Sequence, residues 1–312
     1  MTRASRLGAG AFAVAGIAGA TALVWGTAIE RYVYTLRRAE LAILPAGAAP
    51  VRVLHLSDIH MAPWQRRKQR WIASLVGLRP DLIINTGDNL GHAEGLAGVR
   101  AALEPFAGTP GVFVHGSNDM LGPAPRNPFR YFLGPSGRRP QAEKLDTAAM
   151  ERFFVDELGW HDLNNRVAHL RVGGATIRAI GTGDAHHKHD DLDALDAVAA
   201  QARDSGDAAS SALTIGVTHA PYRRILDALL ARDADALFAG HTHGGQVRVP
   251  GYGALVANCD IPLRQARGLS TWTSGDRSVP LNVSAGIGHS IYAPVRFACP
   301  PEATLITLTA RA

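Results

Sequence analysis

The chain has 312 residues, of which 46% are hydrophobic and 19% are charged. This composition excludes an intrinsically disordered or collagen-like chain, and the length is ample to bury a hydrophobic core. The formal net charge of +5 suits an anionic membrane or a nucleic acid, but no run of five or six like charges occurs, so we expect no nucleic acid as a specific partner. The two cysteines, Cys259 and Cys299, are too few for a disulfide framework. Whether they pair is left open.

The first segment, residues 1–30, contains a long apolar run. No charged residue lies between Leu7 and Ile29, and a helix of this length would span roughly 34 Å, which is enough for the hydrocarbon core of a bilayer. We therefore expect a single membrane-spanning helix that anchors the protein in the cell membrane. Arginines flank the run on both sides, so the positive-inside rule does not decide which side the domain faces. A cleaved signal peptide is the alternative, because Ala20–Ala22 offers a small-x-small cleavage site.

Residues 31–50 are expected to form a short extended stretch and a linker, and residues 51–312 a single domain. Short runs rich in Val, Ile and Leu alternate here with segments that suit helices, which predicts a layered α/β fold. The expected strands are Val51–Leu56, Asp81–Thr86, Val112–His115, Val167–Val172, Thr176–Ile180, Leu213–Thr218, Asp235–Ala239 and Thr304–Leu308. The expected helices are Gln65–Leu78, Glu94–Glu104, Thr147–Leu158, Asp191–Arg203 and Tyr222–Ala231.

Polar side chains follow five of these strands at the point where each strand ends. In α/β sheets, ligands bind beyond the carboxyl ends of the strands, so we expect these side chains to converge on one crevice. Carboxylate, imidazole and carboxamide groups without cysteine suit divalent metal ions such as Mn, Fe or Zn. The residues are Asp58 and His60 after the first strand, Asp88 after the second, Ser117, Asn118 and Asp119 after the third, His219 after the sixth, and His241 and His243 after the seventh.

Two of these histidines lie in the glycine-rich stretch GHTHGGQ, residues 240–246. Glycine allows the backbone to turn sharply and allows a ligand to approach closely. We interpret the stretch as a turn that presents both His241 and His243 to a pair of metal ions.

Taken in order, the five clusters resemble the motifs of the calcineurin-like metallophosphoesterase superfamily, which are D-x-H, G-D, G-N-H-[DE], a lone His and G-H-x-H. The resemblance runs from about Pro50 to the C-terminus. It extends to the bacterial membrane-anchored branch, because VLHLSDIH follows soon after an apolar segment and RFACPPEATLITL lies near the end. The resemblance implies a layered β-sandwich flanked by helices, with two divalent metal ions, of which Mn, Fe and Zn are the candidates.

The resemblance also assigns roles to the ligands. It implies that Asp58, His60 and His243 bind one metal ion. His219, His241 and an asparagine would bind the other, and Asp88 would bridge the two.

The third motif departs from the family pattern, because the chain reads GSND where the family has G-N-H-[DE]. Either Ser117 or Asn118 takes the place of the ligand, and we favour Asn118 because a carboxamide oxygen is a better ligand than a hydroxyl. In both alignments the catalytic histidine of the family is missing. Asp119 is the candidate for the general acid in its place.

By analogy with the family, we expect hydrolysis of a phosphoester by a hydroxide held between two metal ions, at a membrane. The substrate is a phosphodiester, a pyrophosphate or a monoester, and proximity to a bilayer favours a lipid-linked phosphate. The alternative is a non-catalytic, metal-dependent binding or scaffold protein with the same fold. The altered GSND motif is the feature that supports this alternative.

Overall fold

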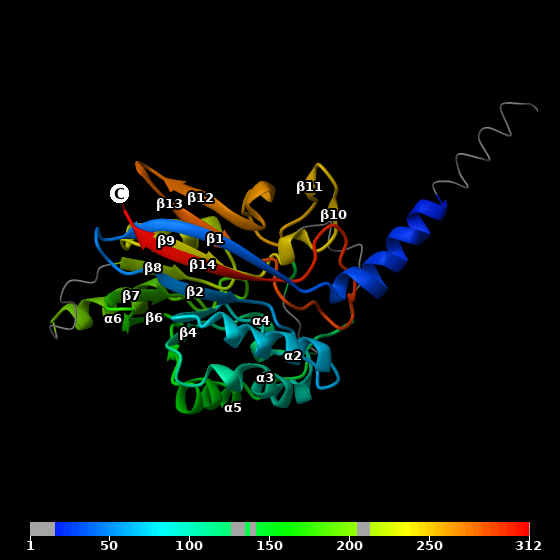
Figure 1. Ribbon diagram of the computed structural model, residues 1–312, viewed down its shortest axis with the longest axis horizontal. Coiled ribbons are helices and arrows are strands. Elements are labelled where there is room, and N and C mark those ends of the chain that lie inside the picture. The colour runs from blue at the N-terminus through cyan, green and yellow to red at the C-terminus, as the bar shows by residue number, and fades with distance from the viewer. Residues whose placement is uncertain (1–15, 126–134, 138–141, 205–212, 312) are drawn as a thin grey trace, which may run out of the picture.

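The computed structural model describes residues 16–125, 135–137, 142–204 and 213–311. Two six-stranded sheets pack against each other, and helices cover the outer face of each sheet (Figure 1). The strand order is β1-β14-β2-β3-β4-β5 in the first sheet and β12-β13-β9-β8-β7-β6 in the second. The expected layered β-sandwich flanked by helices is thereby confirmed.

The first sheet combines parallel and antiparallel pairing. Its strands are β1 (Thr35–Leu44), β2 (Val51–Leu56), β3 (Leu82–Asn85), β4 (Gly111–Phe113), β5 (His161–Asp162) and β14 (Glu302–Ala310). Strands β2 to β5 run parallel, whereas β14 runs antiparallel to β2 and parallel to β1. The carboxyl ends of β2, β3 and β4 therefore lie along one edge of the sheet.

The second sheet has a parallel centre. Its strands are β6 (Arg166–Val172), β7 (Ala175–Gly181), β8 (Leu213–Val217), β9 (Ala236–Ala239), β12 (Gly268–Ser274) and β13 (Arg277–Val283). Strands β7, β8, β9 and β13 run parallel, and the antiparallel strands β6 and β12 form the two edges. A separate two-stranded ribbon consists of β10 (Arg248–Val249) and β11 (Gly253–Ala254).

The main hydrophobic core lies between the two sheets. Val51 and Val53 of β2 point into it, together with Ile215 of β8 and Phe238 of β9. The alternating residues of β2 point the other way, so that Leu54 packs in a second cluster under the helices. Side chains alternate between the two faces of a strand, so a strand buried on both faces reads as a continuous apolar run.

All five expected helices are present in the structure, most of them shorter than expected. Helices α2 (Arg66–Ser74), α3 (Leu96–Leu103) and α5 (Thr147–Arg152) cover the first sheet, and α6 (Leu192–Asp204) and α7 (Arg223–Ala231) cover the second. A short helix, α4 (Ser117–Met120), follows β4. The 3₁₀ and π turns are η1 (Trp25–Ile29), η2 (Glu30–Tyr32), η3 (Leu75–Leu78), η4 (Ala93–Gly95), η5 (Glu104–Phe106), η7 (Phe153–Glu157), η8 (His243–Gly245) and η9 (Leu263–Gln265).

The N-terminal helix projects away from the body of the molecule (Figure 1). Residues 16–24 are helical and lead into η1, and apolar side chains such as Ile17 and Leu23 are more than 60% exposed. Within the described part of the chain, no helix has both the length and the apolar character needed to cross a bilayer. The expected membrane-spanning helix over Leu7–Ile29 is therefore not shown, and its residues 7–15 lie outside the described part of the chain.

Residues 31–50, expected as an extended stretch and linker, contribute an edge strand to the first sheet. Strand β1 pairs with β14 from Thr35 to Leu44. Charged residues interrupt the apolar pattern of β1, as is common on an edge strand that faces solvent. Strands β12 and β13 were not expected, because their polar, half-exposed sequences lack a long apolar run.

Cys259 and Cys299 are both free thiols.

Candidate metal centre

The candidate ligands lie in loops at the carboxyl ends of five parallel strands. Asp58 and His60 follow β2, Asp88 follows β3, Asn118 follows β4, His219 follows β8, and His241 and His243 follow β9. Because β2 to β4 belong to one sheet and β8 and β9 to the other, the site lies where the edges of the two sheets meet. The sandwich brings together loops that are far apart in sequence.

The backbone of these loops is unusually strained. Asp58, His60 and Asp88 have φ angles of 48°, 43° and 55°, and His241 and His243 have φ angles of 68° and 48°. Non-glycine residues adopt the left-handed region at a cost of about 1–3 kcal/mol each, and they persist there only when surrounding contacts enforce it. Such strain concentrates at functional sites, so this pattern supports a ligand-binding role for the loops.

Two glycines stand where another side chain would occupy the site. A Cβ atom at Gly116 would lie 2.2 Å from Oδ1 of Asp88, and one at Gly240 would lie 2.5 Å from Oδ2 of Asp58. These positions have no room for any other residue. The glycine before His241 is thus required by close packing against a carboxylate, more than by the flexibility of a turn.

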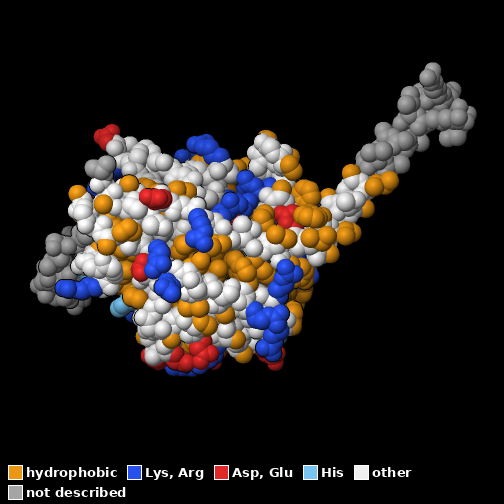
Figure 2. Space-filling view, in the orientation of Figure 1, with side chains coloured by type: hydrophobic (Ala, Val, Ile, Leu, Met, Phe, Trp, Pro, Cys, Tyr) orange, Lys and Arg blue, Asp and Glu red, His pale blue; other side chains and the backbone are white. Residues whose placement is uncertain are grey.

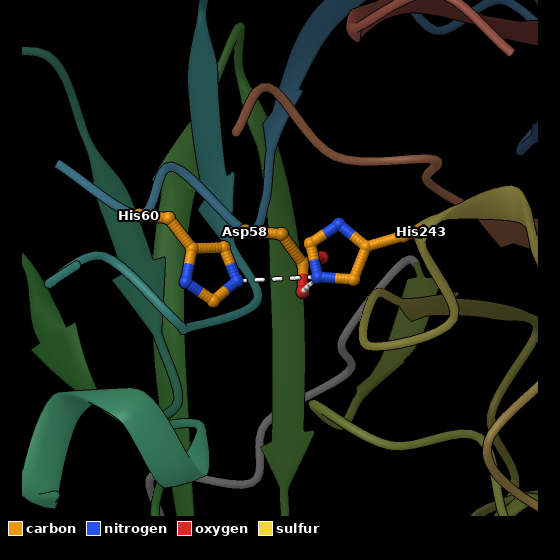
Figure 3. A group of neighbouring side chains, drawn as sticks. All are labelled: Asp58, His60 and His243. Carbon is orange, nitrogen blue, oxygen red and sulfur yellow. Dashed lines mark hydrogen bonds and ion pairs between the residues drawn. The ribbon is translucent and has the colours of Figure 1, made fainter. Parts of the chain in front are cut away.

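Asp58, His60 and His243 form the first group of potential ligands (Figure 3). One ligand atom from each lies within 4.8 Å of the others. The Nε2 atoms of the two histidines are 3.1 Å apart, and Nε2 of His243 lies 3.6 Å from Oδ1 of Asp58. The three side chains point toward one another, and His243 is the partly exposed member of the group (Figure 3).

Asp88 lies between the first group and a second group. Its Oδ2 atom is 3.5 Å from Nε2 of His60 and 3.6 Å from Nε2 of His219. Asp58, Asp88 and His219 also have ligand atoms within 4.8 Å of one another. Asp88 therefore occupies the position expected of a bridging ligand.

Asn118 and His241 complete the second group. Nδ2 of Asn118 donates to Oδ2 of Asp88 at 2.6 Å. Nδ1 of His241 lies 3.2 Å from Nε2 of His219. Ser117 is 3.4 Å from the Asn118 amide, and the contact to Asp88 is made by Asn118. The structure thus brings all seven expected metal ligands together in one cluster, in which all but the partly exposed His243 are buried.

Asparagine and threonine backbone groups contact the outer ring nitrogens of two histidines. Nδ1 of His219 lies 2.7 Å from the carbonyl of Thr86, whereas Nε2 of His241 lies 3.2 Å from the carbonyl and 3.3 Å from the side-chain amide nitrogen of Asn258. A carbonyl only accepts, so Nδ1 of His219 donates, and Nε2 is the atom of this ring that faces Nδ1 of His241. Once deprotonated, Nε2 of His219 can bind a cation. Such outer hydrogen bonds are what orient histidine ligands at metal sites.

The charges in the site favour positive occupants. Burial raises the pKa of both Asp58 and Asp88 above the usual range of a carboxyl group. Burial lowers the pKa of His219, but the nearby carboxylates of Asp88, Asp58 and Asp184 outweigh this effect and raise it to about 9. Carboxylates clustered out of water repel one another, and a divalent cation relieves this repulsion. The donor set of carboxylate, imidazole and amide groups fits two divalent ions.

Asp119, the expected candidate for the general acid, is fully buried and engaged with the backbone. Its Oδ2 accepts hydrogen bonds from the N–H groups of Asp88 (2.8 Å) and Gly116 (3.0 Å), and its Oδ1 accepts from those of Asn89 (2.6 Å) and Leu90 (3.2 Å). A general acid must reach the proton acceptor on the substrate. This geometry instead makes Asp119 the link between the loops after β3 and β4, and it does not support the expected catalytic role.

Two buried basic residues that hold the ligand loops carry no motif in the sequence. Lys68 is buried and donates hydrogen bonds to the carbonyls of Ile59 and His60. Arg296 is also buried, and its Nη2 lies 3.3 Å from Nδ1 of His243. Neither has a motif of its own, since both act largely on backbone carbonyls. For Lys68, the rarity of lysine in this arginine-rich chain is the one feature of the sequence that sets the residue apart.

Two sheets converge on carboxylates and imidazoles that form two overlapping groups of potential metal ligands, as a dinuclear metal hydrolase requires. The model of the calcineurin-like phosphoesterase family matches residues 51–245, and the chain belongs to this family. Members are phosphoester hydrolases that use two divalent metal ions, and the Asp and His groups described above are the residues that would hold them.

Several solved structures are similar to this chain. They include TT1561 of Thermus thermophilus, with a TM-score of 0.42, 11% identity, and coverage of 76% of this chain and 91% of that one. The Haemophilus influenzae NAD nucleotidase has a TM-score of 0.43 and 13% identity, and the match covers 77% of this chain and 51%, about half, of the nucleotidase. GAP50, the anchor in the inner membrane complex of Plasmodium, has a TM-score of 0.37, 14% identity, and coverage of 76% and 71%. No curated protein sequence matches the chain.

Proposed function

We propose that this protein hydrolyses a phosphoester at the cell membrane, with two divalent cations held by the seven ligands from Asp58 to His243. One observation carries the proposal. Two pairs of imidazole nitrogens face each other at 3.1 Å and 3.2 Å, and each pair is flanked by buried carboxylates. This arrangement leaves a place for one cation beside each pair, with Asp88 between them.

When bound, two divalent cations supply a nucleophile at neutral pH and stabilise the charge that develops on a phosphoryl oxygen. The protein contributes the geometry. Asp88 sits between the two groups of ligands, the carbonyl of Thr86 orients His219 so that its Nε2 faces the site and would bind a cation once deprotonated, and Asn258 holds the ring of His241. Because these groups are fixed before the substrate arrives, they cost little reorganisation during the reaction.

The leaving group limits the choice of substrate. The GSND motif places Asn118 against Asp88, and Asp119 is engaged with the backbone. Since the family's histidine is missing from this motif, the reaction depends on a leaving group that departs without a strong proton donor. A pyrophosphate or another activated diester meets this condition better than an alkyl monoester.

The membrane context rests on the N-terminal segment. The apolar helix at residues 16–24 projects from the body, and the exposed side chains of Trp25, Ile29 and Val33 continue the apolar surface toward the domain. The junction lies close to the site, because the carbonyl of Gly26 accepts a hydrogen bond from the N–H of Arg296, whose side chain contacts His243. A phosphoester linked to a lipid would therefore be presented near the metal centre.

The activity test uses the full-length chain in detergent micelles, stripped of metal and reloaded with manganese. We expect metal-dependent hydrolysis of an aryl phosphodiester and of a lipid-linked pyrophosphate, and its loss in Asp88→Ala. Asp276→Asn is the matched control, because Asp276 is exposed in the turn between β12 and β13. Manganese binding without any turnover would favour the scaffold alternative over the enzyme.

The location is tested separately. We expect the full-length chain to float with liposomes in a density gradient and to resist extraction with high salt and carbonate. A chain lacking residues 1–24 should remain in the unbound fraction. Recovery of both forms in the unbound fraction would contradict the membrane proposal without affecting the enzymatic one.

A further inference from the structure

A buried glutamate joins the N-terminal helix to the segment that leads into β14. Glu30 is 5% exposed, and its carboxylate accepts hydrogen bonds from Nε1 of Trp25 (2.6 Å) and from the N–H groups of Ala298 (3.0 Å) and Cys299 (2.5 Å). Hydrogen bonds to an ionised acceptor are stronger than those between neutral groups. Glu30 therefore holds residues 298 and 299 tightly at the base of the helix.

A second contact fixes the same segment one turn earlier. The N–H of Arg296 donates to the carbonyl of Gly26 at 3.0 Å. A Cβ atom at Gly26 would lie 2.9 Å from the Arg296 carbonyl oxygen and 3.1 Å from the Val295 side chain. The helix and the segment 295–299 thus pack backbone against backbone, without room for a side chain between them.

The other side of this segment contacts the first group of metal ligands. Nη2 of Arg296 lies 3.3 Å from Nδ1 of His243, and Sγ of Cys299 donates to the His243 carbonyl at 3.3 Å. The backbone of His243 is therefore held by Cys299, and Arg296 packs against the His243 ring while the two protons of its Nη2 are directed at the carbonyls of Gly286 and Gly288.

Arg296 also reaches the loop that packs on Asp58. Its guanidinium donates to the carbonyls of Gly286 and Gly288, and the N–H of Gly288 donates to the Asp58 carbonyl at 2.6 Å. The Arg296 side chain is fully buried, and both of its Nη atoms donate to backbone carbonyls, whereas its Nε has no hydrogen-bond partner among the described residues. The position of Arg296 is thus set by the carbonyls of Gly286 and Gly288, and the loop that contains them also packs on Asp58.

We propose that Glu30 is a positioning residue for the cation site formed by Asp58, His60 and His243, and that it acts through Arg296 and Cys299. The base of the N-terminal helix is then part of the metal centre's support, in addition to any role as an anchor. The inference rests on the metal site of the proposed function, but it does not depend on hydrolysis.

The site formed by Asp88, Asn118, His219 and His241 has different support. Its histidines contact the carbonyls of Thr86 and Asn258, which belong to other segments than residues 295–299. A substitution at the junction should therefore lower the affinity of one cation site selectively. A substitution that only destabilises the fold would lower the affinity of both sites.

The test measures manganese bound per full-length chain in detergent, at a series of free manganese concentrations. The variants are Glu30→Gln, which keeps the shape of the side chain, and Cys299→Ala, which removes only the thiol donor. Glu40→Gln, on an exposed position of β1, is the control. Electron paramagnetic resonance reports whether the two ions are coupled or whether a single ion is bound.

We expect the wild type and Glu40→Gln to bind two coupled ions. In Glu30→Gln, the affinity for one ion should fall at least about tenfold, and an uncoupled single-ion spectrum should appear at concentrations that saturate the wild type. Cys299→Ala should show a smaller change in the same direction. Two coupled ions of wild-type affinity in both variants would overturn the proposal, and so would a parallel loss of both ions. Manganese binding tests the role of Glu30 even in a preparation that hydrolyses no phosphoester.

Discussion

The Nε2 atom of His60 lies 3.1 Å from the Nε2 atom of His243, although 183 residues separate the two in the sequence. Two imidazoles in this arrangement share a proton or face a common cation, because two bare lone pairs repel each other. Asp58 lies beside His243 and Asp88 beside His60, so negative charge surrounds the pair. The surface view shows Lys and Arg side chains spread over several parts of the visible face (Figure 2), whereas these acidic ligands are buried.

Gly240→Ala is expected to damage the first cation site. The added methyl group would lie 2.0 Å from Oγ of Ser57 and 2.5 Å from Oδ2 of Asp58, so the carboxylate must move. We expect the affinity for one manganese ion and the value of kcat/KM to fall by about 10–100-fold. Metal titration and steady-state kinetics measure these changes.

Gly77→Ala is the control for this substitution, because no atom lies within 4 Å of a Cβ at Gly77 and its φ is not left-handed. It should leave both quantities unchanged. Wild-type metal affinity in Gly240→Ala would show that the close approach to Asp58 is unimportant.

Asp119→Asn separates a structural role from an acid role. In the wild type, both oxygens of Asp119 accept hydrogen bonds from backbone N–H groups. The asparagine keeps one acceptor oxygen, but its NH₂ group would face N–H groups that are themselves donors. We expect a loss of about 2–4 kcal/mol in the free energy of unfolding. Metal content and activity should fall together, and to the same extent for aryl substrates with good and with poor leaving groups. An effect confined to poor leaving groups, with normal stability, would restore Asp119 as the general acid.

Metal affinity should rise with pH. Burial raises the pKa of both Asp58 and Asp88, so in mildly acidic solution a cation must displace protons that an ordinary carboxylate would already have lost. We expect the increase in melting temperature caused by manganese to be much smaller at pH 5 than at pH 7.5. Differential scanning fluorimetry with and without a chelator measures this, and an equal increase at both values would argue against the buried carboxylates as ligands.

His115 should make stability depend on pH above neutrality. Burial lowers the pKa of His115, but its contacts with Asp119 and Glu151 outweigh this effect and raise it from 6.5 to about 9. A raised pKa in the folded state stabilises the protein fully below the ordinary value and loses this contribution as the pH rises through about 9. In metal-saturated protein, we expect the wild type to lose about 1 kcal/mol more than Glu151→Gln between pH 6.5 and 9.

The control is Glu157→Gln, because Glu157 pairs with Arg100, which does not titrate in this range. Its pH profile should match that of the wild type. Identical profiles for Glu151→Gln and the wild type would mean that Glu151 contributes nothing to the charge of His115.

The sequence by itself determined the sheet strands with continuous apolar runs and the candidate metal ligands that the structure brings together. A strand that is buried on both faces needs an apolar run, as in Ala236–Ala239, and polar ligands can follow only where the strand ends. Ligand chemistry also leaves few choices, so Asp58, His60, Asp88, His219, His241 and His243 stand out against a mostly apolar background. Strand ends and donor types are both local properties, and a single sequence records them.

Only the tertiary structure decided which groups support these ligands. Asp119 binds backbone N–H groups about 30 residues away, and Glu30 binds others 268 and 269 residues away. Backbone donors and acceptors are the same at every residue, so the sequence carries no mark of which ones a side chain meets. The edge strand β1 is decided in the same way, because its partner β14 lies at the other end of the chain. These contacts follow from the packing of two sheets, which no local pattern encodes.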